Sequence, residues 1–187
     1  MDDNTLVESS FSATINAPIE NVDIPSWCFT LPESEYQACS PAHCSAGATT
    51  SPDGRRMSIN VEVLGGSLVV QHYIEEIGEP HHLRLASTSD LFTPSGRTKI
   101  GVIWDLSVNR IDDKTCEFTN TVHSSATPNY WTFSASKAFR GTSSRLAANQ
   151  FPKRITGRRR LCSPRALSVM RSGTAEIQRR NRGTPHI

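Results

Sequence analysis

The sequence lacks long apolar segments and a secretory signal. No run of 18 or more apolar residues occurs, about the length that a helix needs to span a bilayer. The chain begins Met1-Asp-Asp-Asn, which is acidic where a secretory signal would be basic and then apolar. We therefore predict a soluble, intracellular protein. We expect it in the cytoplasm, or in the nucleus if its basic C-terminal segment is an import signal.

The sequence also lacks the common catalytic motifs. It contains no G-x-S-x-G, no H-E-x-x-H, no P-loop and no G-x-G-x-x-G. This removes the common hydrolase, metalloprotease and nucleotide-binding classes, and no cofactor is predicted. It does not exclude an enzyme whose catalytic groups are scattered over a cavity wall, so catalytic activity stays open.

The cysteines lack the spacing that is typical of a disulfide framework or a zinc site. The five cysteines form an odd set without a C-x-x-C pair, so neither a disulfide scaffold nor a zinc ribbon is indicated. Cys39, His43 and Cys44 bring soft metal ligands together in sequence. Positions 39 and 44 do not share a helical face, however, and a fourth ligand is missing. We predict buried or idle thiols and no metal site.

Acidic residues are almost missing from the last quarter of the chain. Residues 1–136 hold 17 Asp and Glu against 7 Lys and Arg, whereas residues 137–187 hold 13 Lys and Arg against Glu176 alone. The net charge of +2 therefore describes neither part. We predict a globular domain over residues 1–150 and a basic, disordered tail over residues 151–187.

The body of the sequence has the periodicity of β-strands. Residues 10–16 alternate apolar and polar side chains and end at Pro18. Residues 18–47 favour one or two short helices. Five further strands, each bounded by a turn signal, are predicted over residues 57–63, 67–77, 82–90, 98–109 and 115–124. Short connections between them predict an antiparallel meander, and the whole order predicts an α+β domain with a curved sheet.

The sheet needs a cover on its apolar face. We expect the more apolar residues of each strand to face inward, at alternate positions. These are Met57, Ile59, Val61 and Val63; Leu68, Val70, His72 and Ile74; Ile100, Val102, Trp104, Leu106 and Val108; and Cys116, Phe118, Asn120 and Val122. An imperfect helix over residues 129–150, interrupted by Gly141, would supply part of the cover.

This order of elements resembles the START-like, polyketide-cyclase (SRPBCC) or helix-grip superfamily. The resemblance is carried by Ser12-Ala-Thr-Ile-Asn-Ala-Pro-Ile-Glu-Asn-Val22, which is similar to its opening strand and helix entry. Asp53-Gly-Arg-Arg-Met-Ser-Ile-Asn-Val-Glu62 and Val70-Gln-His-Tyr-Ile-Glu75 resemble bacterial and fungal members. The resemblance implies a curved sheet wrapped around a long C-terminal helix and an apolar cavity. It also implies a hydrophobic ligand such as a lipid or polyketide, carried without reaction or converted by a cyclase, dehydratase or isomerase.

Two polar residues on the predicted inner face are candidates for chemistry. His72 can act as an acid or base, or it can be a hydrogen-bonded core histidine. Asn120 can orient a ligand oxygen, or it can pair with a neighbouring side chain. Candidates to line a pocket, or to be plain core, are Met57, Ile59, Val70, Trp104 and Phe118.

The basic segment has three interpretations. Lys153-Arg154 and Arg158-Arg-Arg160 would attract nucleic acid or an import receptor. A second interpretation is an inert disordered arm, because apolar residues are few and net charge is high. A third is the product of a reading-frame shift or retained intron, because the segment begins where the superfamily helix is expected. A nucleic-acid-associated protein acting through its tail is thus a second alternative function.

Overall fold

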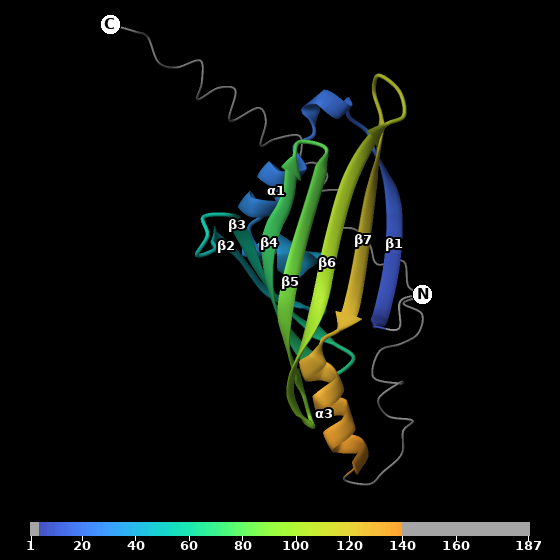
Figure 1. The fold of residues 1–187 in the computed structure, drawn as a ribbon. Helices are drawn as coiled ribbons and strands as arrows, with labels where there is room; N and C mark the ends of the chain where they lie inside the picture. The colour runs from blue at the N-terminus through green and yellow to red at the C-terminus, as the bar shows by residue number, and fades with distance from the viewer. Residues whose placement is uncertain (1–3, 140–187) are drawn as a thin grey trace, which may run out of the picture.

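A computed structural model describes residues 4–139 of the chain. Within that range seven strands form one antiparallel sheet in the order β1-β7-β6-β5-β4-β3-β2 (Figure 1). The strands are β1 (Thr5–Ile15), β2 (His43–Thr50), β3 (Arg56–Leu64), β4 (Ser67–Glu79), β5 (His82–Thr93), β6 (Gly96–Arg110) and β7 (Cys116–Ala126). Strands β3 to β7 follow one another as a meander, and β1 closes against β7.

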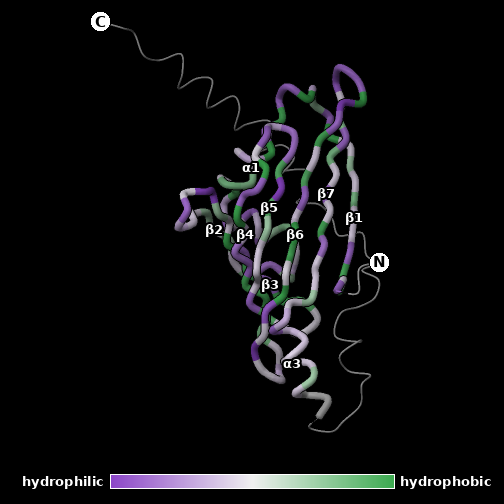
Figure 2. The backbone as a smooth tube through the Cα atoms, viewed as in Figure 1, coloured by the Kyte–Doolittle hydropathy of each residue, from purple (hydrophilic) through white to green (hydrophobic). Residues whose placement is uncertain are grey.

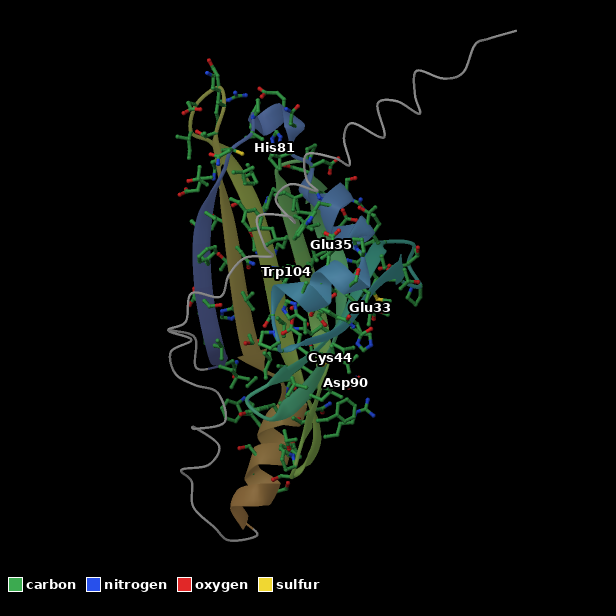
Figure 3. The ribbon with its side chains drawn as sticks, turned by 180° about the vertical axis from the view of Figure 1, so that it is seen from behind. Glu33, Glu35, Cys44, His81, Asp90 and Trp104 are labelled. Carbon is green, nitrogen blue, oxygen red and sulfur yellow. The ribbon has the colours of Figure 1, made fainter. Side chains whose placement is uncertain are left out.

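The helices are short and gather at two places. The 3-10 turn η1 (Ile19–Asn21), α1 (Ile24–Thr30) and α2 (Glu33–Cys39) connect β1 to β2. Helices α1 and α2 lie on the face of the sheet that is turned toward the viewer in Figure 3, with Trp104 behind them. Helix α3 (Pro128–Phe139) continues from β7 at one end of the sheet (Figure 1). We call the face under α1 and α2 the inner face.

The core lies between the inner face and α1. Its fully buried side chains come mainly from the central strands and from the start of α1: Ile24, Leu83, Leu85, Leu106, Cys116 and Phe118. Hydrophobic and hydrophilic residues alternate along the strands, whereas α3 is mostly pale (Figure 2). Burying each large apolar side chain contributes about 1.5–3 kcal/mol. Ile24 and Cys28 of α1 are part of this core, and the strands that α1 chiefly contacts are β2, β3, β4 and β5.

The α+β class and the curved antiparallel sheet are confirmed, and the strands predicted after residue 56 correspond to β3 through β7. Strand β2 was missed, because His43-Cys-Ser-Ala-Gly-Ala-Thr-Thr contains no large apolar residue whose alternation could reveal a strand. Helix α3 matches the first part of the helix predicted over residues 129–150. The rest of that helix, the boundary at residue 150 and all interpretations of the tail lie outside the described residues.

The prediction of inward-facing residues is right for β6 and β7 but wrong for β3 and β4. Ile100, Val102, Leu106, Val108, Cys116 and Phe118 are buried on the inner face. In β3 and β4 the buried positions are instead Ser58, Asn60, Ser67, Val69, Gln71 and Tyr73. The more apolar set of these two strands faces outward. On the inner side Ser58 bonds Asn60 and Glu62 bonds Tyr36 of α2, whereas Val69 and Tyr73 join the hydrophobic core. No helix of residues 4–139 is long and apolar enough to cross a membrane.

Candidate functional site

Helix α1 is fixed at its first residues. Asp23 caps it: its carboxylate Oδ1 accepts a 2.9 Å hydrogen bond from the Ser26 N–H. The Ile24 N–H donates to the Pro80 carbonyl at 2.9 Å, which ties the helix start to the turn between β4 and β5. Trp27 and Cys28 follow at helical spacing from Ile24, so they face the sheet.

Helix α2 is fastened to β2 by polar contacts. The Gln37 amide donates to the Cys44 carbonyl at 2.7 Å, and the Ser45 hydroxyl donates to Glu33. His43 Nδ1 lies 2.7 Å from the Tyr36 carbonyl, and the His43 and Tyr36 rings stack with centroids 4.0 Å apart. These contacts hold Tyr36 over the inner face.

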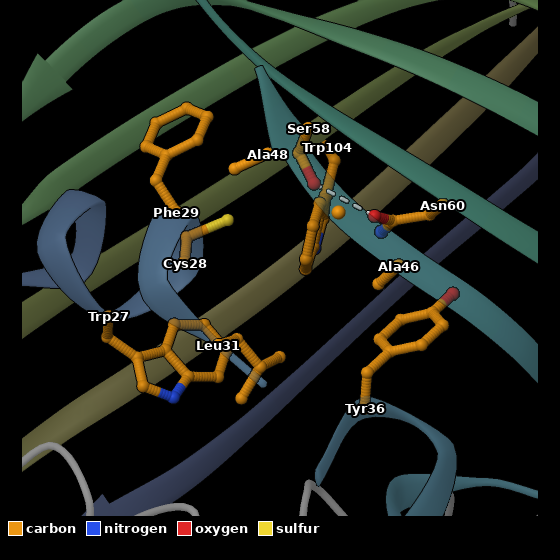
Figure 4. A pocket seen from close by; sticks show the side chains of 11 residues that line it. Trp27, Cys28, Phe29, Leu31, Tyr36, Ala46, Ala48, Ser58, Asn60 and Trp104 are labelled. Carbon is orange, nitrogen blue, oxygen red and sulfur yellow. Dashed lines mark hydrogen bonds between the residues drawn. The ribbon is translucent and has the colours of Figure 1, made fainter. Parts of the chain in front are cut away.

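A pocket lies between the two helices and the sheet (Figure 4). Its wall combines aromatic and apolar side chains with a few polar groups: Trp27, Cys28, Phe29, Leu31, Tyr36, Ala46, Gly47, Ala48, Ser58, Asn60 and Trp104. The cavity volume is about 20 Å³, which is room for about one water molecule. A bound ring compound would need a cavity of about 150 Å³. Entry of such a ligand therefore requires α1 or α2 to move.

Trp104 links the pocket to the far strands of the sheet. Its indole N–H donates to Asn120 Oδ1 at 3.1 Å, and its ring lies 5.4 Å from the Tyr73 ring, tilted by 49°. The hydrogen bond satisfies the polar edge of the indole, so its apolar surface is free to face the pocket. Asn120 therefore positions Trp104.

The polar part of the wall comes from β3. The Ser58 hydroxyl donates to Asn60 Oδ1 at 2.8 Å, the bond drawn as a dashed line in Figure 4. Opposite these residues, the buried indole N–H of Trp27 has no hydrogen-bond partner among the described residues. A pocket with an apolar wall and a few polar groups is the usual form of a small-molecule site.

Tyr36, Glu62 and His43 form an ionisable cluster beside the pocket. The Tyr36 hydroxyl donates to Glu62 Oε1 at 2.8 Å, and His43 Nε2 lies 3.6 Å from the same oxygen. Burial raises the pKa of the Tyr36 hydroxyl well above its ordinary value of 10.0, and the Glu62 charge raises it further. Tyr36 therefore stays a proton donor. Because His43 Nδ1 faces a carbonyl, it carries a hydrogen and donates it, and the Nε2 of the same ring is turned toward Glu62.

The structure places the predicted site residues in three different regions. Trp104 lines the pocket and is bonded to Asn120, whereas Phe118 is buried in the core and does not line it. Met57, Ile59, Val70 and His72 lie on the outer face of β3 and β4; Ile59 is the cross-strand partner of His72. The inward orientation on which a role for His72 rested is therefore wrong.

Sequence reasoning missed the residues of α1, α2 and β2 that form the pocket. It also missed Asn60, Glu62 and Gln71, because it assigned the more apolar set of alternate residues in β3 and β4 to the inner face. A usable signal was present. Ser58, Asn60 and Glu62 occupy alternate positions and therefore lie on one face of the strand, and a few polar groups on an otherwise apolar wall are typical of a small-molecule site.

Comparison with known proteins gives similarity in fold only. No family model matches the chain, and no curated protein does. Among solved structures, the chain is similar to a START superfamily protein from Mycobacterium smegmatis, with 12% identity, coverage of 91% of this chain and 98% of that one, and a TM-score of 0.45. It is also similar to the aromatase/cyclase Zhui from Streptomyces sp. R1128, with 10% identity, 97% and 99% coverage and a TM-score of 0.46. Norcoclaurine synthase from Thalictrum flavum follows with 12% identity, 79% and 84% coverage and a TM-score of 0.42.

Proposed function

We propose that this protein binds a hydrophobic small molecule between helices α1 and α2 and the inner face of the sheet. The observation that carries the proposal is the pocket wall, in which the rings of Trp27, Phe29 and Trp104 occur together with the polar Ser58 and Asn60 of β3. An aromatic wall favours a flat apolar ligand, because ring contacts add about 0.5–1.5 kcal/mol beyond burial alone. Asn120 contributes by holding Trp104 in place.

The test is binding of a panel of lipids and fused-ring aromatics, measured by thermal shift and by quenching of tryptophan fluorescence. We expect at least one fused-ring compound to raise the melting temperature in a saturable way. Trp104→Leu should weaken that compound about tenfold, or about 1.4 kcal/mol. Trp131→Leu is the matched control, because Trp131 lies on α3 and is exposed. If no compound binds, or if both variants weaken binding equally, the pocket is not the site.

A second candidate function is proton transfer to or from the bound molecule. The observation that favours it is the cluster of Tyr36, Glu62 and His43, joined to the pocket through the Tyr36 ring. In this proposal Glu62 is the base, Tyr36 stabilises its carboxylate, and His43 exchanges the proton with solvent. Such a site would serve a cyclase, dehydratase or isomerase.

Hydrogen–deuterium exchange into 2-tetralone, followed by NMR, tests this second function without knowledge of the natural substrate. The wild-type protein should accelerate exchange at the carbons next to the carbonyl, and Glu62→Gln should lower the rate about 100-fold. Glu33→Gln serves as control, because Glu33 bonds Ser45 outside the pocket wall. Binding of 2-tetralone with no acceleration by the wild type would leave the protein a carrier.

A further inference from the structure

A buried polar layer continues from the pocket wall into the sheet. Asn60 lines the pocket and is the direct cross-strand partner of Gln71, and Ser58 is the partner of Tyr73. Ser87 and Ser89 extend the layer on β5, with their hydroxyls 3.0 Å apart. These side chains lie on the inner face and are buried; Asn60 is 4% exposed and Gln71 6%.

Gln71 is the unsatisfied member of this layer. Its amide oxygen Oε1 is buried and has no hydrogen-bond partner in the described part of the chain. Buried amide groups are nearly always hydrogen-bonded, because an unpaired one loses its water without compensation. Gln71 is therefore a residue that costs stability, and a ligand that pairs its oxygen would explain its presence.

Asn60 supplies the complementary group. Its Oδ1 already accepts from the Ser58 hydroxyl at 2.8 Å, so its amide nitrogen is the group left to donate. Directly opposite side chains on neighbouring strands have Cβ atoms about 4.5–5.5 Å apart. One ligand atom can thus contact both amides, if it accepts from Asn60 and donates to Gln71. A hydroxyl does both, whereas a ketone, ether or carboxylate oxygen only accepts.

We propose that Asn60 and Gln71 bind a hydroxyl group of the ligand, so that the ligand is a hydroxylated ring compound rather than a plain hydrocarbon or a fatty acid. This inference rests on the proposed function, because it needs the pocket to be the binding site. The apolar body of the ligand lies against Trp104 and Trp27, and the hydroxyl enters the polar layer at Asn60. Gln71 acts as a specificity-determining residue.

The experiment uses two probes in which the hydroxyl hydrogen of one is replaced by a methyl group in the other. Dissociation constants of 2-naphthol and 2-methoxynaphthalene are measured by tryptophan quenching for the full chain and for Gln71→Met, which keeps the length of the side chain but removes its amide. The wild type should prefer 2-naphthol by about tenfold, or about 1.4 kcal/mol. In Gln71→Met the preference should fall to about one, with the affinity for 2-methoxynaphthalene unchanged. Gln37→Met is the matched control and should keep the preference, since Gln37 bonds the Cys44 carbonyl away from the pocket.

The melting temperature of Gln71→Met distinguishes a ligand-binding role of Gln71 from a purely structural one. Because Gln71 Oε1 is unpaired, Gln71→Met should melt at the same temperature as the wild type or higher. The proposal is overturned if Gln71→Met keeps the preference, or if the wild type binds both probes equally. Equal binding of both probes by the wild type is measured without any variant, and it does not contradict the proposed pocket. If neither probe binds, both the proposed function and this inference are contradicted.

Discussion

At the scale of single residues, Cys28 illustrates how burial sets the chemistry of the pocket. Its thiol lines the pocket from α1, and burial raises the pKa of Cys28 from 9.0 to about 12. A thiol attacks as its thiolate, so at neutral pH Cys28 is an apolar wall group and not a nucleophile. The free thiol Cys44 is exposed instead.

The raised pKa of Cys28 predicts a loss of stability at alkaline pH. Because the folded pKa lies above the unfolded value, the stabilisation is complete below about pH 9 and is lost as the pH rises toward 12. At about pH 10 ionisation of the unfolded thiol should lower the free energy of unfolding by about 1.4 kcal/mol. Tyr36 and Tyr73, whose pKa values are also raised by burial, add to the loss at still higher pH.

Urea unfolding at about pH 8 and pH 10 measures this loss. In Cys28→Ala the change between the two pH values should be smaller by about 1.4 kcal/mol, whereas Cys44→Ala should behave like the wild type. An unchanged pH dependence in Cys28→Ala would contradict the prediction.

The site could be predicted from the sequence only in part, and the reason lies in individual side chains. Trp104 and Asn120 were correctly assigned to the inner face, because in β6 and β7 the more apolar set of alternate residues is the buried one. In β4 the same rule selected His72 over Gln71 and Tyr73. The buried side of β4 follows ring packing instead, since Tyr73 lies against Trp104 with the ring centroids 5.4 Å apart. Periodicity locates a face but does not say which side is covered.

At the scale of elements, the β3–β4 hairpin sets which residues reach the pocket. Its two-residue turn is Gly65-Gly66, with φ values of 56° and 80°, the combination required at both positions of a type I′ turn. The turn pairs Leu64 with Ser67 and thereby pairs Asn60 with Gln71. The glycine pair was readable as a turn in the sequence, whereas the small residues of β2 gave no comparable signal.

Substitution of Gly66 tests the conformational requirement alone. A Cβ at Gly66 would meet no atom within 4 Å, so Gly66→Ala changes the backbone preference without a clash. The positive φ should lower the free energy of unfolding by about 1–2 kcal/mol. Gly47→Ala in β2 is the control, because its Cβ is equally unobstructed and its φ is not in the left-handed region. Equal urea midpoints for the two variants would show that the turn tolerates a side chain.

At the scale of the whole molecule, the sheet is divided between two kinds of inner face. The inner face of β6 and β7 is largely apolar, as in any core, and buries Leu106, Cys116 and Phe118. The half formed by β3 and β4 has a more polar inner face, where Ser58, Asn60, Ser67 and Gln71 accompany Val69 and Tyr73, and it is apolar outside. Its outer face carries a row of exposed apolar side chains, in which Val63 pairs with Leu68 and Leu68 pairs with Phe92. They are 45%, 37% and 38% exposed. The overall α+β architecture followed from strand periodicity, but this inversion did not, because it depends on what α2 presents to the sheet.

The inversion predicts that the outer row, and not the pocket, governs the solubility of the protein. Contiguous exposed apolar surface promotes association, whereas single exposed residues do not. Changing Val63 and Leu68 together to Thr puts β-branched side chains, which suit strands, at both positions while removing apolar surface. The double variant should bind less 1-anilinonaphthalene-8-sulfonate and precipitate at higher ammonium sulfate concentration than the wild type.

Ile111→Thr is the control, because Ile111 is exposed outside the row, between β6 and β7. Affinity for a pocket ligand should stay the same in both variants, since the row lies on the opposite face of the sheet. A loss of pocket binding in the double variant would mean that the two faces of β3 and β4 are not independent.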